Sequence, residues 1–523
     1  MEPVEPVPSP PGDGPAPSSA SESHQLRRRA RLGMMILGAR SMVQQVVVLG
    51  GTILLTKLLD PGDYGTFAIV QFVMSLFRVV GDTGLGPSLI QQTETPTQRV
   101  LSTVFWTQLA VTSAILVAAQ LGGGFLVTLW PDQPADLPNL FRALSFSLLL
   151  TMLRVIPSIM LERELRYIPL ALSNILGTLG FYGTATTLAW AGAGTGALVG
   201  AVLAQSTLSL ITIYVVRPWR PSFTFERAAL PALLRFGIFF QGRNIIGMVN
   251  GAVAPVLAGG VLGAAALGYN NYARNTAWFP LQVVSIIGQV SFPLFSRLAH
   301  DREALAAEMR FSLLACGTAA IAFAVLFFGL GPQVVSIIYH PKWLPAMPAL
   351  YIYSVTLIVG FIAPIAAAAF DGVGKPEVMF RLSVFWTTIN VVVVSAALYL
   401  SPDLVSFAAA YCVHVVVGNV ATLYMLGKEL PGLSFFRLVW RLLVVGAGVA
   451  AVGRFVVAPR VGGLSTLVLA VTALAAAFVG LAVLVDPKLR TALGRLKERL
   501  GERRRKKKAR DAKKREAALR GRH

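Results

Sequence analysis

Charged residues are scarce in this chain of 523 residues, at 14%, and only two cysteines occur. Cys316 and Cys412 lie far apart in apolar segments, which excludes a disulfide framework and a cysteine-based zinc site. Acidic residues inside apolar segments are limited to Asp82 and the border residue Asp371, so paired carboxylates for glycosyl transfer are missing. No phosphate-binding loop of the GxxxxGK type occurs. These absences argue against an enzyme and an ATP-driven pump, and no cofactor or metal ion is expected.

Apolar residues dominate instead, with 55% hydrophobic residues and a mean hydropathy of +0.65. A helix needs about 20 predominantly apolar residues to cross the hydrocarbon core of a bilayer. Segments of this length predict an all-α integral membrane protein with about 14 transmembrane helices. They cover residues 34–58, 64–91, 101–130, 139–161, 167–190, 195–216, 231–259, 267–296, 308–338, 345–370, 378–400, 403–426, 434–456 and 463–485.

The spans group into two sets of six, followed by two more. Basic residues alternate from loop to loop, which by the positive-inside rule predicts that both termini are cytoplasmic. Lys342 and Arg460 are the clear basic exceptions in the loops assigned to the outside. The predicted divisions are a disordered cytoplasmic tail (1–30), an N-terminal six-helix bundle (31–217), a cytoplasmic linker (218–230), a C-terminal six-helix bundle (231–427), two extra helices (428–485) and a basic cytoplasmic tail (486–523).

The basic tail carries much of the net charge of +21 and contains the run RRRKKK at 503–508. Such a run next to a membrane span is attracted to anionic lipid head groups, at about 1 kcal/mol per basic residue. The alternative is a solvated tail that only reinforces the topology. Nucleic-acid binding is not expected, because no folded basic domain accompanies the run.

Two polar stripes with helical spacing lie inside apolar segments, 203 residues apart. The first is Gln71, Ser75, Arg78 and Asp82, and the second is Arg274, Trp278, Leu281 and Ser285. An arginine that faces lipid costs about 2.5–17 kcal/mol, so these side chains are expected to face an interior cavity. A transporter for an anionic substrate is the first hypothesis that this pattern suggests.

The same offset relates further features and indicates an internal repeat. It pairs LDPGDYG (59–65) with LGAAALG (262–268) and Arg40 with Arg243, while Pro157 and Pro364 pair at an offset of 207. Because six spans per unit is an even number, the two bundles should be parallel repeats with a substrate site at their interface.

The candidate substrate-binding residues follow from the stripes and the repeat. They are Arg40, Gln44, Arg78, Arg243, Asn271, Arg274, Trp278 and Gln282, with Asp82 as an ion-pair or coupling partner. Arginine suits phosphate oxygens, and amides with an aromatic face suit sugar rings. An ion pair between Arg78 and Asp82 that only locks their helix is the alternative for those two residues. Arg154 is assigned equally to the cavity or to a neighbouring partner, and His414 to packing.

The motifs LTKLLDPGDYGTFAIV and VVGDTGLGPSLIQQ within 55–92, with the segment at 262–298, resemble the Wzx-like polysaccharide flippases of the MOP transporter superfamily. The resemblance implies a V-shaped pair of bundles and alternating access. It further implies translocation of polyprenyl-diphosphate-linked oligosaccharide units, such as undecaprenyl-linked ones, across the bacterial cytoplasmic membrane. Surface polysaccharide synthesis, as of exopolysaccharide, lipopolysaccharide or capsule, would then involve polymerase and export components as partners.

Two other transporters remain as alternatives. Similar lipid II flippases use arginines of their first and eighth helices, which correspond to Arg40 and Arg274. A MATE-type drug/cation antiporter should hold carboxylates within the membrane, whereas this interior is rich in arginine.

Overall fold

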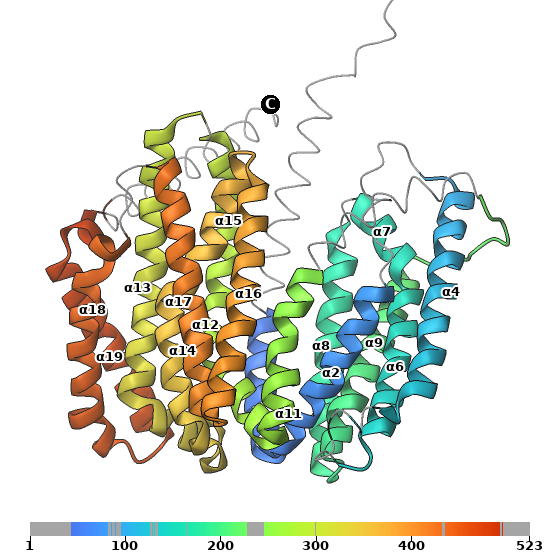
Figure 1. Ribbon diagram of the computed structural model, residues 1–523, viewed down its shortest axis with the longest axis horizontal. Coiled ribbons are helices and arrows are strands. Elements are labelled where there is room, and N and C mark those ends of the chain that lie inside the picture. Colours follow the sequence, from blue (N-terminus) through green and yellow to red (C-terminus); the bar gives the residue numbers. More distant parts are fainter. Residues whose placement is uncertain are drawn as a thin grey trace, which may run out of the picture.

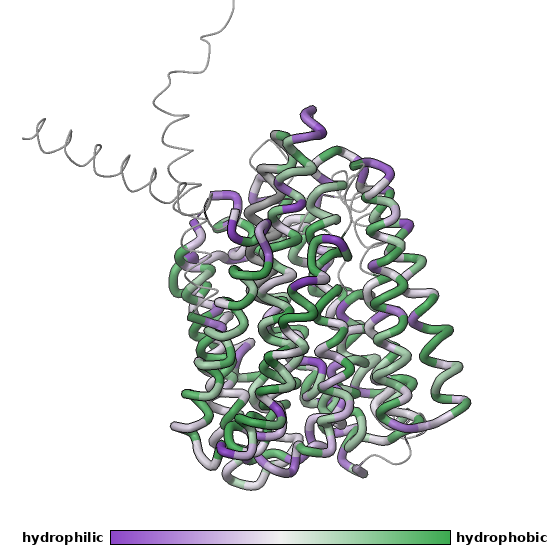
Figure 2. Tube along the Cα trace, turned by 90° about the vertical axis from the view of Figure 1, so that its left-hand side faces the viewer, coloured by the Kyte–Doolittle hydropathy of each residue, from purple (hydrophilic) through white to green (hydrophobic). Residues whose placement is uncertain are grey.

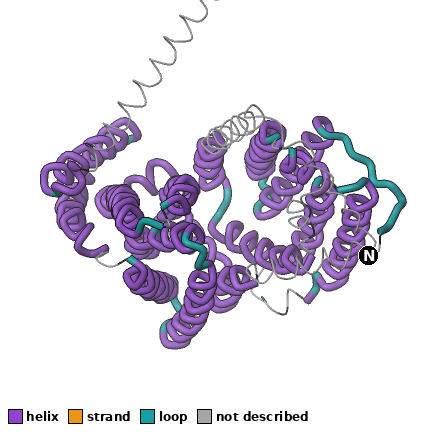
Figure 3. Tube along the Cα trace, turned by 90° about the horizontal axis from the view of Figure 1, so that it is seen from above, coloured by secondary structure: helices purple, strands orange, loops and turns teal. Residues whose placement is uncertain are grey.

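The computed structural model describes residues 43–81, 96–125, 134–164, 166–226, 245–298, 300–430 and 435–491, with positions 85, 89, 128, 130 and 494. The regular elements in these residues are all helical, and strands are absent from them (Figure 3). The prediction of an all-α protein is therefore confirmed. Nearly all of the two predicted tails lies outside the described residues.

Labelled helices from the first half of the chain stand together on the right of Figure 1 and form the N-terminal group. Their bounds are α2 (Pro61–Gly81), α4 (Gln98–Gly122), α6 (Leu137–Leu153), α7 (Val155–Arg163), α8 (Tyr167–Trp190) and α9 (Thr195–Val216). A shorter apolar helix, Val43–Leu58, precedes α2 and packs through Leu55 on α8 and α9.

Most helices of the second half form the C-terminal group on the left of Figure 1. The apolar helix Ile245–Val261, which contains η2 (Ala254–Ala258) and α11 (Gly259–Val261), leads into this half. The rest are α12 (Gly263–Arg297), α13 (Arg302–Val334), η3 (Val335–Tyr339), η4 (Pro341–Ala346), α14 (Met347–Gly360), α15 (Ile362–Gly372), α16 (Pro376–Leu400), α17 (Leu404–Glu429), α18 (Phe435–Val452), η5 (Gly453–Val457), η6 (Ala458–Arg460) and α19 (Leu464–Val485).

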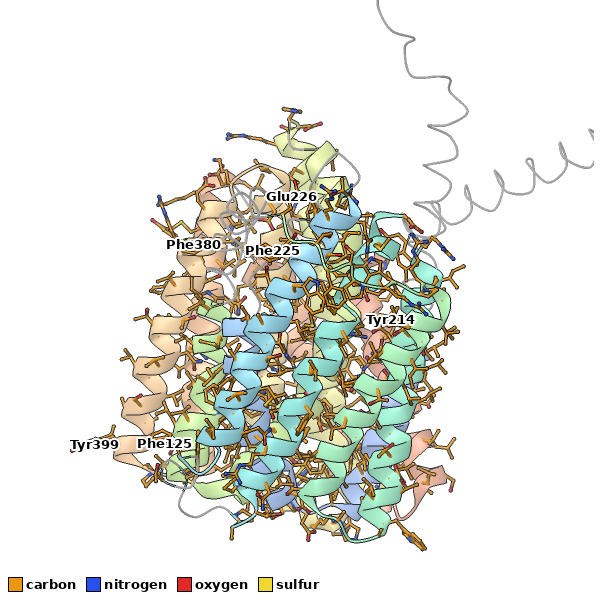
Figure 4. The ribbon with its side chains drawn as sticks, turned by 90° about the vertical axis from the view of Figure 1, so that its right-hand side faces the viewer. Phe125, Tyr214, Phe225, Glu226, Phe380 and Tyr399 are labelled. Carbon is orange, nitrogen blue, oxygen red and sulfur yellow. The ribbon has the colours of Figure 1, made fainter. Side chains whose placement is uncertain are left out.

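The surface of the molecule suits a bilayer. Nine helices in the described residues are long and apolar enough to cross a membrane. Hydrophilic segments gather at the two ends, with hydrophobic chain between them (Figure 2). Exposed aromatic side chains lie near both ends, with Phe125 and Tyr399 at one and Phe225 and Phe380 toward the other (Figure 4). Aromatic residues favour the membrane–water interface, so the chain is a multi-pass membrane protein.

Two of the predicted spans are each divided into two helices. One break falls at Arg154 between α6 and α7, and the other at Phe361 between α14 and α15. A proline follows each break by three residues, Pro157 and Pro364. Proline has no N–H, and its ring clashes with the carbonyl four residues earlier, so the helix must bend there. The backbone angles are nearly equal, φ −86° and ψ −6° at Arg154 and φ −80° and ψ −10° at Phe361. The two prolines paired by the repeat thus have the same structural effect.

Candidate functional site

A cavity of about 970 Å³ lies between the two groups of helices. Both halves of the chain line it, through the helices Val43–Leu58, α2, α8 and α9 from the first and Ile245–Val261, α12, η3 and η4 from the second. Its polar lining consists of Thr52, Thr56, Tyr64, Gln71, Ser75, Tyr182, Asn271, Tyr272, Arg274, Asn275, Thr276 and Tyr339.

Most helices that line the cavity are too short or too polar to count among the nine helices that could cross a membrane by length and composition. Val43–Leu58 and Ile245–Val261 are too short among the described residues, and α2, α8 and α12 are not among the nine apolar spans. A helix that faces an aqueous space can carry polar residues on that side at little cost. The cavity therefore explains part of the polar stripes of α2 and α12, since Gln71, Ser75 and Arg274 reach it.

Arg274 is the one charged residue in the described lining of this cavity. One Nη of its guanidinium group donates a hydrogen bond to Oδ1 of Asn271 at 3.3 Å, and the Tyr411 hydroxyl is a further hydrogen-bond partner. Among the described residues, no carboxylate lies within 4.0 Å of it. The cavity thus presents a positive charge that an anionic ligand can neutralise, with neutral partners holding the side chain in place.

One end of the cavity is closed by contacts between the two groups. The Trp343 indole of η4 donates a hydrogen bond to the Thr56 carbonyl at 2.8 Å, and Trp343 is completely buried. Its ring also packs edge-on against Tyr64 and stacks on Tyr272, with centroids 5.4 and 4.5 Å apart. Because Thr56 and Tyr64 belong to the first half of the chain, this cluster forms a floor shared by both halves.

Two glycines bring the helix starts together at the same end, which lies at the bottom of Figure 1. A Cβ atom built on Gly65 of α2 would overlap the Ala264 carbonyl, and one on Gly268 of α12 would overlap the Pro61 carbonyl. The contact is reciprocal, since Pro61 and Gly65 pair with Ala264 and Gly268 at the offset of 203. Only residues without a side chain permit this backbone approach.

An ion pair crosses the two halves next to these glycines. The Nζ atom of Lys342 lies 3.2 Å from Oδ1 of Asp60 and donates a second hydrogen bond to the Lys57 carbonyl, also at 3.2 Å. Lys342 is one of the exceptions to the alternation of loop charges. The ion pair with Asp60 explains the exception, because Lys342 connects the two groups of helices and is therefore not expected to follow the positive-inside rule.

The structure separates the other predicted site residues. Gln44 donates a hydrogen bond to Oγ1 of Thr178 at 3.2 Å, and Trp278 donates one to Oγ1 of Thr356 at 2.9 Å; neither is part of the cavity lining. Arg78 lines a different pocket, inside the N-terminal group. The helix α12 continues through Gln282, but the side chain of Gln282 is not described. Arg40, Asp82 and Arg243 lie outside the described residues.

Sequence reasoning did not find the aromatic floor. Tyr64, Tyr272, Tyr339 and Trp343 come from three separate segments, and no spacing within one helix relates them. The unexpected charge of Lys342, directly before Trp343, is the signal in the sequence that could have indicated it.

A profile of the family described as "Polysaccharide biosynthesis protein" matches residues 54–348, more than half of the chain. The chain belongs to the polysaccharide biosynthesis protein family. The matched segment begins in the first described helix and ends just beyond Trp343, so it includes both halves of the closed end.

Curated proteins that are similar to this chain match about two thirds of it. The succinoglycan biosynthesis transport protein ExoT of Rhizobium meliloti is 26% identical over 66% of this chain and 68% of its own length. The lipopolysaccharide biosynthesis protein WzxC of Escherichia coli is 24% identical, over 67% and 73% respectively. The teichuronic acid biosynthesis protein TuaB of Bacillus subtilis is 22% identical, over 68% and 72%.

Solved structures share the fold of this family member. The lipid II flippase MurJ in an inward closed conformation superposes with a TM-score of 0.68 at 13% identity, covering 86% of this chain and 99% of that chain. A multidrug MATE transporter of the MOP superfamily in an inward-facing conformation gives 0.55 at 16% identity, covering 77% and 100%. These likenesses show that the chain shares its fold with both transporters.

Proposed function

We propose that this protein is a flippase that moves polyprenyl-diphosphate-linked oligosaccharide units across the cytoplasmic membrane of a bacterium for surface polysaccharide synthesis. The observation that carries the proposal is the cavity shared by both halves of the chain, with Arg274 as the one charged residue of its described lining. Membership of the polysaccharide biosynthesis protein family, with relatives named for succinoglycan, lipopolysaccharide and teichuronic acid, supports a saccharide-containing substrate.

The cavity chemistry fits a substrate that is anionic at one part and polar at another. The Arg274 guanidinium group matches the oxygens of a diphosphate, which must otherwise lose its water within the membrane. Asn271, Asn275 and Gln71 offer amides for sugar hydroxyls, and Tyr64 and Phe279 offer ring faces for sugar C–H groups. Arg40 and Arg243 are proposed to add positive charge to the same space, as the repeat predicts.

Alternating access follows from the closed end. We assign this end to the outer face, with fourteen transmembrane helices arranged as two six-helix repeats plus two, and with both termini in the cytoplasm. Substrate would then enter from the cytoplasmic leaflet while Trp343, Gly65 and Gly268 hold the outer end shut. Their separation would release it outward, where polymerase and export components act on it. The basic C-terminal tail is proposed to contact anionic lipids.

Of the alternatives, an antiporter for cationic drugs is disfavoured, because the described cavity lining contains no carboxylate. A lipid II flippase shares the fold, but the family profile and the curated relatives favour polysaccharide units.

Deletion of the gene and complementation test the proposal. We expect the deletion strain to lose one surface polymer and to retain its undecaprenyl-linked unit on the cytoplasmic side. Arg274→Gln, at equal membrane abundance, should restore less than about a tenth of the polymer, since a charge-assisted contact contributes about 1.5–3 kcal/mol. Arg274→Lys should restore more, because it keeps the charge.

The matched control is Arg142→Gln on α6, whose guanidinium group contacts the Gln120 carbonyl outside the cavity lining. This variant should complement fully. Unchanged surface polymers in the deletion strain, with increased sensitivity to cationic drugs, would contradict the proposed function and support the antiporter.

A further inference from the structure

A second cavity, of about 410 Å³, lies inside the N-terminal group between α2, α4, α6 and α7. Arg78 of α2 and Arg154 at the α6–α7 break both line it. Glu162 is its acidic residue, so the lining has one positive charge in excess. Among the described residues, no carboxylate lies within 4.0 Å of either guanidinium group. The remaining polar lining residues are Gln108, Thr112, Thr151 and Ser158.

The bend at Pro157 creates this pocket. The proline leaves the carbonyl of Leu153 without a helical N–H partner. The hydroxyl of Tyr214 on α9 donates a hydrogen bond to that carbonyl at 3.0 Å (Figure 4). Tyr214 therefore supplies the hydrogen bond that the Leu153 carbonyl lacks, and Arg154, at the break itself, lines the cavity between α2, α4, α6 and α7.

The corresponding break in the C-terminal group has no such pocket lining. Phe361 takes the place of Arg154 there, with the same backbone conformation, and is completely buried in the apolar core. Leu281, the counterpart of Arg78 at the offset of 203, packs against this core beside Gly360. The other polar lining residues of α6 and α7 also have apolar counterparts at the offset of 207: Ile358 for Thr151, Ile365 for Ser158 and Ala369 for Glu162.

The comparison of the two breaks shows that the bent helix pair does not require arginines for its stability. The bent helix pair is stable around an apolar core, as Phe361 and Ile365 demonstrate. Arg78 is exposed and Arg154 is half-buried, and neither has a carboxylate partner among the described residues. A half-buried guanidinium group at a helix bend among apolar helices is unfavourable unless a ligand or water solvates it. The arginines of the N-terminal group are therefore not explained by packing.

We propose that the pocket between α2, α4, α6 and α7 is a binding site for a phosphoryl group, separate from the central cavity. Arg78 and Arg154 bind the phosphate oxygens, and Thr151 and Ser158 donate hydrogen bonds to them. Glu162 lies one turn beyond Ser158 on α7 and lines the same pocket, so it opposes the anion, and the two arginines leave one positive charge in excess. A soluble phosphate and a phospholipid head group both supply this chemistry. The site concerns binding alone and stands independently of the proposed transport function.

Calorimetry on the full-length protein in detergent, with inorganic pyrophosphate as the probe in chloride-free buffer, tests the site. We expect saturable binding by the wild type and a dissociation constant at least tenfold higher for Arg78→Gln and for Arg154→Gln. Arg142→Gln, the same exchange elsewhere on α6, should bind as the wild type does. Absence of binding by the wild type, or loss of binding in Arg274→Gln alone, overturns the proposal, since the probe then has no site in this pocket.

The double variant Arg78→Leu with Arg154→Phe copies the C-terminal group and guards against a trivial folding defect. It should unfold at the wild-type temperature or above and should not bind pyrophosphate. Retained binding of pyrophosphate would show that the two arginines do not form the site. A lower unfolding temperature would show that they stabilise the fold.

Nanodiscs identify the source of the phosphoryl group. With phosphatidylglycerol present, loss of the wild-type pyrophosphate isotherm assigns the site to lipid head groups. An unchanged isotherm assigns it to a soluble phosphate compound.

Discussion

Replacing Gly65 with alanine tests whether the closed end depends on direct backbone contact between α2 and α12. The new Cβ atom would lie 2.8 Å from Cα of Ala264 and would overlap the carbonyl of that residue. Carbon atoms in contact are about 3.5–4.0 Å apart, and the carbonyl carbon of Ala264 would lie at 2.5 Å, so the two helix starts must separate by about 1–1.5 Å. The obstacle is backbone on a helix, which cannot rotate away as a side chain can.

The cost of such overpacking is typically about 1–3 kcal/mol. If it falls on the closed conformation alone, the ratio of closed to open molecules drops by about 5- to 150-fold. The reciprocal variant Gly268→Ala meets Cα of Pro61 at 3.1 Å, and its carbonyl carbon at 2.7 Å, and should have an effect of the same size.

Pulsed electron paramagnetic resonance can measure this shift with spin labels on two exposed residues of the closed end, Ala193 and Leu400. The labels require replacement of Cys316 and Cys412. Gly65→Ala should increase the population of long distances. Gly183→Ala on α8, where a Cβ atom has no neighbour within 4 Å, is the matched control and should not. If Gly65→Ala and Gly268→Ala both gave the distance distribution of Gly183→Ala, the glycine contact could not hold the end closed.

Two smaller effects are expected from charged residues at the ends of helices. Asp60 is 78% exposed, so its ion pair with Lys342 should contribute a coupling energy of only about 0.2–1 kcal/mol. A double-mutant cycle of Asp60→Asn and Lys342→Met, with the same distance measurement as the readout, checks this value. A coupling energy above about 2 kcal/mol would contradict the assignment of the closure to the glycines and Trp343. Hydrogen bonds, first from the Ser401 hydroxyl and then from the backbone N–H and hydroxyl of Ser406, lower the pKa of Asp403 to about 2 from its usual 3.8. A lowered pKa means that this carboxylate stabilises the start of α17 fully above about pH 4, and that the stabilisation is lost as the pH falls toward 2. Thermal unfolding of Asp403→Ala should therefore show a loss of about 0.5–2 kcal/mol at pH 6 that shrinks toward pH 2, and a loss independent of pH would refute the role of the charge.

Much of the architecture is written in local patterns of the sequence. The apolar run at 195–216 coincides with α9, and the run at 463–485 coincides with α19 within one residue. The agreement is close because a helix that crosses the hydrocarbon core of a bilayer needs about 20 consecutive, predominantly apolar residues. The repeat is also visible locally, since a proline bends its helix wherever it occurs. Pro157 and Pro364 could therefore be paired before their bends were seen.

The candidate site was predictable only in part. Arg274 and Asn271 reach the central cavity, as the polar stripe of their helix indicates. Arg78 belongs to an equally good stripe, yet it lines the pocket inside the N-terminal group. Helical spacing gives the face of a helix but not the neighbour that the face meets, and a long side chain near the edge of a face can reach either side.

The sequence by itself determined that this is a helical membrane protein with a repeated polar interior, since hydropathy and proline act over one or a few turns. Only the tertiary structure decided where the cavity closes. Trp343 meets Thr56 and Lys342 meets Asp60 across more than 280 residues, and Gly65 meets Ala264 across 199. Such contacts depend on how two groups of helices lean against each other, and no periodicity within one segment encodes that angle.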